Sequence, residues 1–594
     1  MSHLLSTSRT CKPYTIIFRA RYALLVILVV VTFLWFSLPV QPSATTPAIL
    51  ATPNQQDLWP PRPIQPGSND QQSDKYRAYR IREAFVHTYN HYLERAFPND
   101  ELRPVSGRNA STLNGWGVTM YDSLDTAHLM HLDAYIDHAA NYLAEEPSVF
   151  HLAPAKYAPF FETVIRYLGG LLGVYALTEH TIFLEKADKL GRLLLPVFDT
   201  TSGLPAYSVN TVSGDTQGGW SPDALLAESA SCQVEYKYLA HLTGRADYFH
   251  AVDRVMGVLE AANTDAHPDT EDPEDAPKTG LIRHMQSKGA FPTVWDIETG
   301  KPKTLAFSAG GLADSAHEYF LKQYLLSAKS EPRTLSLYLN AVDAILDKLT
   351  FYSPKRDFIY VTDLKTSGQP SHTFEHLTCF VGGMLKLGAE RLKLPVEKKQ
   401  LHNWAAEGLA ETCWMMYADM PTGLSPNEIL VNKDDVRPWL EVLAKSASNG
   451  STTIPGLSRC EPQQFPQRRG YKVKDGKNLL RPEALETWYI MWKFGGGDIW
   501  KERAWATFMA LEKHAKTKYG FASLKSVDVR SSADVRHRDE LPSYFLAETL
   551  KYPYLMFDDS NNISLDQWIF NTEAHPLPIF SWNATEKESY GIPL

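Results

Sequence analysis

A short stretch of this 594-residue chain, LLRPEALETWYIMWK at 479–493, places two carboxylates at the start of a predicted helix. Glu483 and Glu486 are three residues apart, so they share one face of a helix whose other side chains are mostly apolar or aromatic. A buried charge is unfavourable unless it is paired or functional. The pair therefore indicates acid–base chemistry, a site for a hard cation, or the binding of sugar hydroxyls.

The same combination recurs at the starts of other apolar segments. For any single acid, the alternative is a helix N-terminal cap, because the helix dipole favours anions there. A repeated series instead favours convergence on one acidic cavity. The series consists of Asp122 and Asp125, Glu162, Glu228, Asp314 and Glu318, Glu375 and His376, Glu483 and Glu486, and Glu548.

Several other chemistries find no support in the sequence. It contains no Gly-x-Ser-x-Gly elbow, phosphate-binding loop, His-Glu-x-x-His motif or Cys-x-x-Cys pair. The formal net charge of −9 argues against a nucleic-acid partner.

Helices must position these carboxylates. From residue 76 onward, amphipathic segments such as 181–198 alternate with segments that are apolar on nearly all sides, such as 160–177. A helix that is apolar all round is buried, whereas a half-charged helix lies outside. The alternation predicts an all-α fold in one domain at 76–594, a toroid of seven helical hairpins with an inner and an outer ring. The inner helices are expected to begin near Asp122, Phe161, Ala227, Gly311, Phe374, Pro482 and Tyr544.

The N-terminal region predicts a membrane anchor. Residues 22–40 are uncharged and long enough to cross a bilayer, and basic residues precede them. The positive charge predicts a cytoplasmic tail at 1–21 and a lumenal remainder, with a cleaved signal peptide as the alternative. Residues 41–75 are rich in Pro, Ser and Gln and predict a stalk. Sequons at Asn109, Asn449, Asn562 and Asn583 agree with a secretory lumen.

An ordered set of motifs runs from about residue 80 to 580: GWGVTMYDSLDT (115–126), FETVIRYLGGLL (161–172), AESASCQVEYKYLAHLTG (227–244), ADSAHEYFLKQ (313–323), HLTCFVGG (376–383), LRPEALET (480–487), LAETLKYPYLMF (546–557) and FNTEAHPLPI (570–579). In these motifs the chain resembles the class I α-1,2-mannosidases, glycoside hydrolase family 47. The resemblance implies a barrel of seven αα hairpins. It also implies inverting hydrolysis of terminal α-1,2-linked mannose on oligomannose N-glycans, with a bound Ca²⁺.

The resemblance also implies roles for individual residues. Glu162 matches the family's acid, Glu483 the base and Asp314 a third catalytic carboxylate, while Thr572 matches the calcium-binding threonine. Cys379 and Cys413 match a family disulfide, which leaves Cys232 and Cys460 free. The expected contacts to sugar hydroxyls or to the ion's waters are Glu228, Glu318, Arg481, Glu486, Tyr544 and Glu548.

Three positions depart from the family pattern. Asn427 stands where a sugar-contacting Glu is expected, and Tyr544 where Phe is common. Leu312 stands where the single-bond trimmers of the endoplasmic reticulum carry Arg, which predicts removal of several mannoses. The alternatives are a glycan-binding quality-control lectin of this fold and a helical-toroid hydrolase acting on another sugar. Residence in the Golgi or the endoplasmic reticulum and the oligomeric state stay open.

Overall fold

The computed structural model describes residues 73–593, except for 220, 265–288, 460, 464, 559 and 561–562. The predicted tail, the anchor at 22–40 and nearly all of the stalk lie outside the described residues, as do Cys460 and Asn562. The described chain is mostly helical. Its first helix, α3 (Asp74–Arg95), is capped by Ser73, whose hydroxyl accepts the N–H of Tyr76.

The most deeply buried helices form an inner set whose members contact one another in chain order. The π-helical turn Phe545–Thr549, just before the last of them, contacts the first, so the contacts return to their starting point. Three predicted starts, at Asp122, Gly311 and Pro482, lie within about one helical turn of the observed ones. The other four lie six to eight residues before the long inner helices, where a separate short helical segment precedes each of them. The inner set comprises α4 (Val118–Leu129), α7 (Gly169–Thr178), α10 (Gln233–Thr243), α13 (Asp314–Leu326), α15 (Phe380–Arg391), α18 (Glu483–Lys493) and α20 (Lys551–Phe557).

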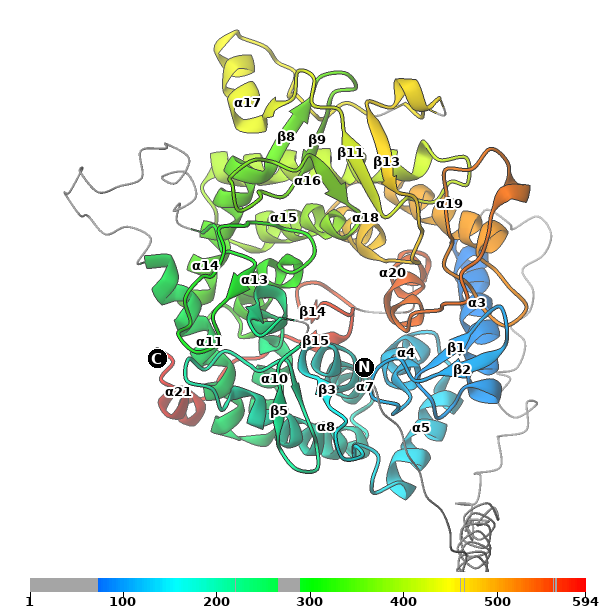
Figure 1. The fold of residues 1–594 in the computed structure, drawn as a ribbon, viewed down its shortest axis with the longest axis vertical. Helices are drawn as coiled ribbons and strands as arrows, with labels where there is room; N and C mark the ends of the chain where they lie inside the picture. Colours follow the sequence, from blue (N-terminus) through cyan, green and yellow to red (C-terminus); the bar gives the residue numbers. More distant parts are fainter. Residues whose placement is uncertain are drawn as a thin grey trace, which may run out of the picture. The chain divides into compact units, whose positions relative to one another are not determined.

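An outer set of helices covers the inner set. Each inner helix contacts the outer helix that follows it in the chain, and α20 contacts α3. Figure 1 shows both sets arranged around a common centre, which agrees with the predicted alternation of buried and half-charged segments. The outer set comprises α3, α5 (Asp133–Glu145), α8 (Thr181–Leu194), α11 (Ala246–Thr264), α14 (Pro332–Ala344), α16 (Val396–Ala418) and α19 (Ile499–His514).

Short antiparallel strands occupy connections that the all-α prediction left irregular. One sheet joins β10 (Thr373–Glu375), β11 (Glu428–Val431) and β13 (Tyr471–Asp475). A two-stranded hairpin of β14 (Trp568–Phe570) and β15 (Pro576–Pro578) lies near the centre of the helical ring and contacts α13 and α7 (Figure 1). This hairpin brings a turn from the end of the chain to the inner helices.

Close packing between the first two inner helices, α4 and α7, requires a glycine. A Cβ on Gly170 would lie 2.4 Å from the carbonyl oxygen of Tyr121, so glycine lets α7 approach α4. Phe160–Thr178 is the one described helical stretch apolar and long enough to span a membrane, but 67% of it is buried inside the protein. Core packing accounts for its composition.

Candidate active site

The starts of α13, α15 and α18, together with the short segments that precede α7, α10 and α20, line a single cavity of about 300 Å³. Its walls contain every predicted site residue: Glu162, Glu228, Asp314, Glu318, Arg481, Glu483, Glu486, Tyr544, Glu548 and Thr572. Asp122 and Asp125 do not line it. They lie in the core, where His575 contacts both, at 3.3 Å and 2.8 Å. Glu375 and His376 do not line it either: Glu375 accepts the N–H of Gly311 at 3.1 Å, and His376 lies behind Glu483. The convergence expected from the sequence therefore occurs, without these four members of the series.

The acid side of the cavity is organised by Arg166. Glu162 ends the short helix α6 (Phe160–Glu162), and a π-helical turn, Thr163–Leu168, follows it. Within this turn, Arg166 donates its Nε–H to Oε2 of Glu162 at 2.7 Å. Its Nη1 group contacts Glu573 and lies 3.5 Å from Asp122. One guanidinium thus connects the candidate acid to the β14–β15 turn.

The other side of the cavity, called the base side here, holds the candidate base Glu483, and His376 positions this carboxylate. Nδ1 of His376 lies 2.8 Å from Oε2 of Glu483, and its Nε2 lies 2.7 Å from the Tyr417 hydroxyl. Nη1 of Arg481 lies 3.5 Å from the other carboxylate oxygen. Burial alone would raise the pKa of Glu483, but the His376 hydrogen bond and the charges of Arg481 and His376 outweigh it, so this pKa is lowered. Glu483 is therefore ionised at neutral pH.

Asp314 behaves in the opposite way. It begins α13 and accepts the N–H of Ser315 at 2.9 Å. Burial, helped by repulsion from Glu483 and Glu318, raises its pKa to about 7 in spite of that hydrogen bond and the nearby Arg481. The cavity thus holds one carboxylate that is ionised and another that retains a proton close to neutral pH. Such a divergence is typical of acid–base sites.

The turn between β14 and β15 forms one wall of the cavity and presents Thr572. Oδ1 of Asn571 accepts the N–H groups of Glu573 and His575, at 2.9 Å and 2.8 Å, and so fixes the turn. The N–H of Thr572 donates to the Tyr319 hydroxyl at 3.3 Å. Neither the hydroxyl nor the carbonyl oxygen of Thr572 is hydrogen-bonded to another described residue. Both oxygens remain available to a ligand.

Carboxyl groups outnumber cationic side chains around Thr572. Lys322 contacts Glu318 and lies 3.5 Å from Glu486, whereas Glu548 has no ion pair within the described chain. Burial raises the pKa of Glu486 to about 8 and that of Glu548 well above its usual range. Among the described residues no three Asp, Glu, His or Cys side chains converge tightly enough to ligate a metal alone. The oxygen donors fit a hard cation held by Thr572, with carboxylates acting through water.

The predicted disulfide is present on the base side. Cys379 and Cys413 are bonded to each other and link the start of α15 to α16, while Cys232 is buried and free. The disulfide lies close to the residues that hold Glu483, the candidate base. His376 precedes Cys379 by three residues, and Tyr417 follows Cys413 by four. The disulfide therefore braces the segments that hold Glu483.

The three departures from the family pattern have distinct surroundings. Asn427 does not line the cavity, and its side-chain amide donates to Asp475 at 3.3 Å. The Tyr544 hydroxyl donates to the carbonyl of Leu479 at 2.6 Å, a contact that Phe could not make. Leu312 has a φ of 76° and is 40% exposed where it lines the cavity. Leu312 and Tyr544 are thus the departures that a bound glycan could meet directly, and Leu312 is the one that changes a charged side chain of the family pattern to an apolar one.

The sequence pattern did not identify Arg166 or Glu573, and it placed His376 among the converging polar residues without predicting its contact with Glu483. Arg166 follows Glu162 by four residues, a spacing that supports an ion pair on a helix. Glu573 directly follows Thr572. The spacing could have identified Arg166 as a partner of Glu162, but nothing local could link it to Glu573.

The sequence profile of glycosyl hydrolase family 47 matches residues 84–579. The chain belongs to glycosyl hydrolase family 47. Among family 47 proteins, it is 31% identical over 549 residues to mannosyl-oligosaccharide alpha-1,2-mannosidase IA of Drosophila melanogaster, covering 90% of this chain and 73% of that one. It is 31% identical over 538 residues to the human endoplasmic reticulum mannosyl-oligosaccharide 1,2-alpha-mannosidase, covering 89% and 68%.

A solved family structure agrees with the fold. The alpha-1,2-mannosidase from Trichoderma reesei superposes with a TM-score of 0.71 at 25% sequence identity, covering 85% of this chain and 99% of that one. The family 47 match therefore extends over nearly all of the helical region.

Proposed function

We propose that this protein is an inverting glycosidase that removes terminal α-1,2-linked mannose from oligomannose N-glycans. Its family and the names of its relatives support the reaction class. The observation that carries the proposal is the shared cavity, in which Glu483 is ionised while Asp314 keeps a proton near neutral pH. An inverting hydrolase needs such a pair of unequal carboxyl groups, with space for a water molecule on one side of the sugar.

In this mechanism Glu483 removes a proton from the attacking water, whose oxygen forms the new bond to the anomeric carbon. The bond from that carbon to the leaving oxygen breaks, and this oxygen takes a proton from Glu162 or Asp314, directly or through water. Arg481 and His376 keep Glu483 ionised, and Arg166 orients Glu162. The sugar hydroxyls would be held by Glu228, Glu318, Glu486, Tyr544 and Glu548.

The hydroxyl and carbonyl of Thr572 would hold Ca²⁺, and neighbouring carboxylates would hold its waters. Free oxygens on Thr572 and the crowded carboxylates support this assignment. When bound, the ion supplies positive charge that orients hydroxyls and eases the deprotonation of water. Calcium should also raise the melting temperature of the wild type, because an ion that binds only the folded state stabilises it. Thr572→Ala should lose this shift.

The complete chain would be a type II membrane protein of the Golgi or endoplasmic reticulum. In this arrangement residues 22–40 anchor it, and a lumenal (αα)7 barrel at 76–594 follows the stalk. Support comes from the basic residues before the apolar segment and from the exposed sequon asparagines Asn109, Asn449 and Asn583. The closed series of inner-helix contacts supports the barrel.

Trimming of a nine-mannose N-glycan by the full-length protein tests the function. We expect free mannose released first as the β anomer, and a product of about five mannoses, since only α-1,2 bonds are cut. Chelation should stop release, and added calcium should restore it. Absence of mannose release with calcium present would favour the lectin alternative, which the names of the relatives do not support. Initial release of the α anomer would contradict inversion.

A further inference from the structure

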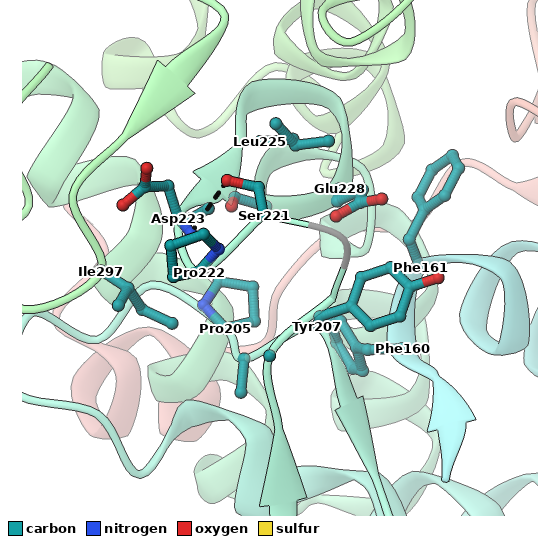
Figure 2. Close-up of a pocket in the computed structure, with 14 residues that line it drawn as sticks. Phe160, Phe161, Pro205, Tyr207, Ser221, Pro222, Asp223, Leu225, Glu228 and Ile297 are labelled. Atoms are coloured by element: carbon teal, nitrogen blue, oxygen red, sulfur yellow. Dashed lines mark hydrogen bonds between the residues drawn. The ribbon is translucent and has the colours of Figure 1, made fainter. Parts of the chain in front are cut away.

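A narrow side cleft adjoins the cavity on the acid side. Phe161, Leu225 and Glu228 line both spaces, so the two are contiguous. Figure 2 shows the cleft running from Glu228 and Tyr207 toward Asp223 and Ile297. None of the proposed catalytic roles uses Tyr207, Ile297 or Asp223.

The cleft has the size and lining for a small substituent. Its volume of about 20 Å³ exceeds the space one water needs but is far too small for a pyranose ring. Pro222, Leu225 and Ile297 supply apolar walls, while the Ser221 hydroxyl accepts the N–H of Asp223 at 3.1 Å and keeps its own proton available. A hydroxymethyl group, with one CH₂ and one OH, matches this combination.

Two polar groups at the junction lack partners. Neither the Tyr207 hydroxyl nor the Glu228 carboxylate makes a hydrogen bond or ion pair to another described residue. Burial and the charges of Glu228 and Glu162 raise the pKa of Tyr207. The Tyr207 ring packs tightly on Gly219, where a Cβ would lie 2.6 Å from it. The aromatic ring is thus held in the cleft, which Glu228 also lines.

We propose that this side cleft holds the hydroxymethyl arm of the leaving-group mannose, the sugar on the reducing-end side of the bond that is cut. The ring of that sugar would lie against Tyr207, because the C–H face of a pyranose packs well on an aromatic side chain. Its primary hydroxyl would bond to Ser221 or Glu228. The inference rests on the proposed function, since Glu162 must deliver its proton to the oxygen of that same sugar.

The test compares two substrates, methyl α-1,2-mannobioside and its analogue lacking the 6-hydroxyl on the reducing-side sugar. The wild type should prefer the parent by about tenfold in kcat/KM, because the analogue leaves the polar groups of the cleft without a hydrogen-bond partner. Tyr207→Ala and Ser221→Ala should reduce this preference to about twofold or less. Tyr207→Ala should act on the parent mainly through KM.

Gly219→Ala gives an independent way to displace the ring and should act like Tyr207→Ala. Val212→Ala is the matched control, because that side chain is 63% exposed and does not line the cleft. A wild type without the preference, or a Tyr207→Ala variant that keeps it, would overturn the proposal. If Tyr207→Ala does not fold, Ser221→Ala carries the same test.

A binding experiment distinguishes an error in the side-cleft proposal from an error in the proposed function. Calorimetric binding of both disaccharides to Glu162→Gln requires no turnover. A tenfold preference for the parent there supports the side cleft even if the wild type proves inactive. Equal affinities overturn the side cleft even if the enzyme trims a nine-mannose glycan normally.

Discussion

The two sides of the cavity fix their carboxylates by different means. On the acid side, the permanently charged Arg166 holds Glu162 and reaches Glu573 in the β14–β15 turn. On the base side, the titratable His376 holds Glu483 and reaches Tyr417 in the outer helix α16. One side is thus tied to the centre of the ring and the other to its periphery.

The comparison shows how one cavity keeps carboxyl groups in different protonation states. Glu483 has a hydrogen-bond donor and positive charge beside it, and its pKa is lowered. Asp314 is buried with only one backbone donor and a more distant arginine, and its pKa rises to about 7. Local partners, rather than residue type, separate the two roles.

The largest effect should come from neutralising the principal residue of each side. Glu162→Gln and Glu483→Gln should each lower kcat by about 10²–10⁴-fold, the usual contribution of a positioned acid or base. Both variants should retain the melting temperature and circular dichroism of the wild type. Near-normal mannose release by either variant would remove that residue from the mechanism.

Asp314 should set the alkaline limit of activity. Its pKa of about 7 means that it loses its proton as the pH rises through neutrality, so kcat/KM should fall there. Asp314→Asn should lower kcat/KM by roughly 10²-fold, and the residual activity should lack this limb. The retained proton also contributes stability at low pH that is lost as the pH rises through about 7. An unchanged alkaline limb in Asp314→Asn would assign it to another group.

His376 should influence the pH below which kcat/KM falls. His376→Gln removes a positive charge near Glu483 and should raise the pKa of this base, so the acid limb of kcat/KM should move to higher pH. At neutral pH we expect a loss of about tenfold. Tyr417→Phe serves as a control that removes only the outer contact, and its shift should be smaller. A pH profile that does not move would show that His376 only fills space.

Leu312 tests whether the rim beside Asp314 controls how many mannoses are removed. An arginine here could donate two hydrogen bonds to a neighbouring glycan branch and favour one binding pose. Leu312→Arg should slow the later cuts of a nine-mannose glycan by roughly ten- to a hundred-fold while sparing the first. Chromatography of the products over time measures this. A wild type that stops after one mannose would contradict the expectation.

Removal of the disulfide tests whether this bond only stabilises the fold around Glu483 or also positions residues for the reaction. It closes a separation of 34 residues, so the paired Cys379→Ser and Cys413→Ser variant should lose about 3–4 kcal/mol of unfolding free energy. Well below the melting temperature, kcat should change little, since neither sulfur lines the cavity. Urea denaturation and initial rates provide the two readouts. A large loss of kcat without a loss of stability would give the bond a positioning role.

Much of this site could be predicted because its carboxylates recur where apolar helices begin. The resemblance added Thr572, whose turn has no helical pattern of its own. The partners were harder to predict: Arg166 and Glu573 are 407 residues apart, and only the folded chain brings them together. Short strands such as β14 also escaped prediction, since three residues show too little periodicity. The direction of Asn427, toward Asp475, depends on strand register.

The β14–β15 hairpin near the centre of the ring has a consequence for turnover. The turn presents Thr572 and Glu573 to the cavity wall near the centre of the ring. We therefore expect a freed mannose to leave on the side from which the glycan enters. On this expectation the shortened glycan withdraws before the monosaccharide, and every sugar removed requires a new encounter between glycan and enzyme. Intermediates with eight, seven and six mannoses should then accumulate in solution during the digest.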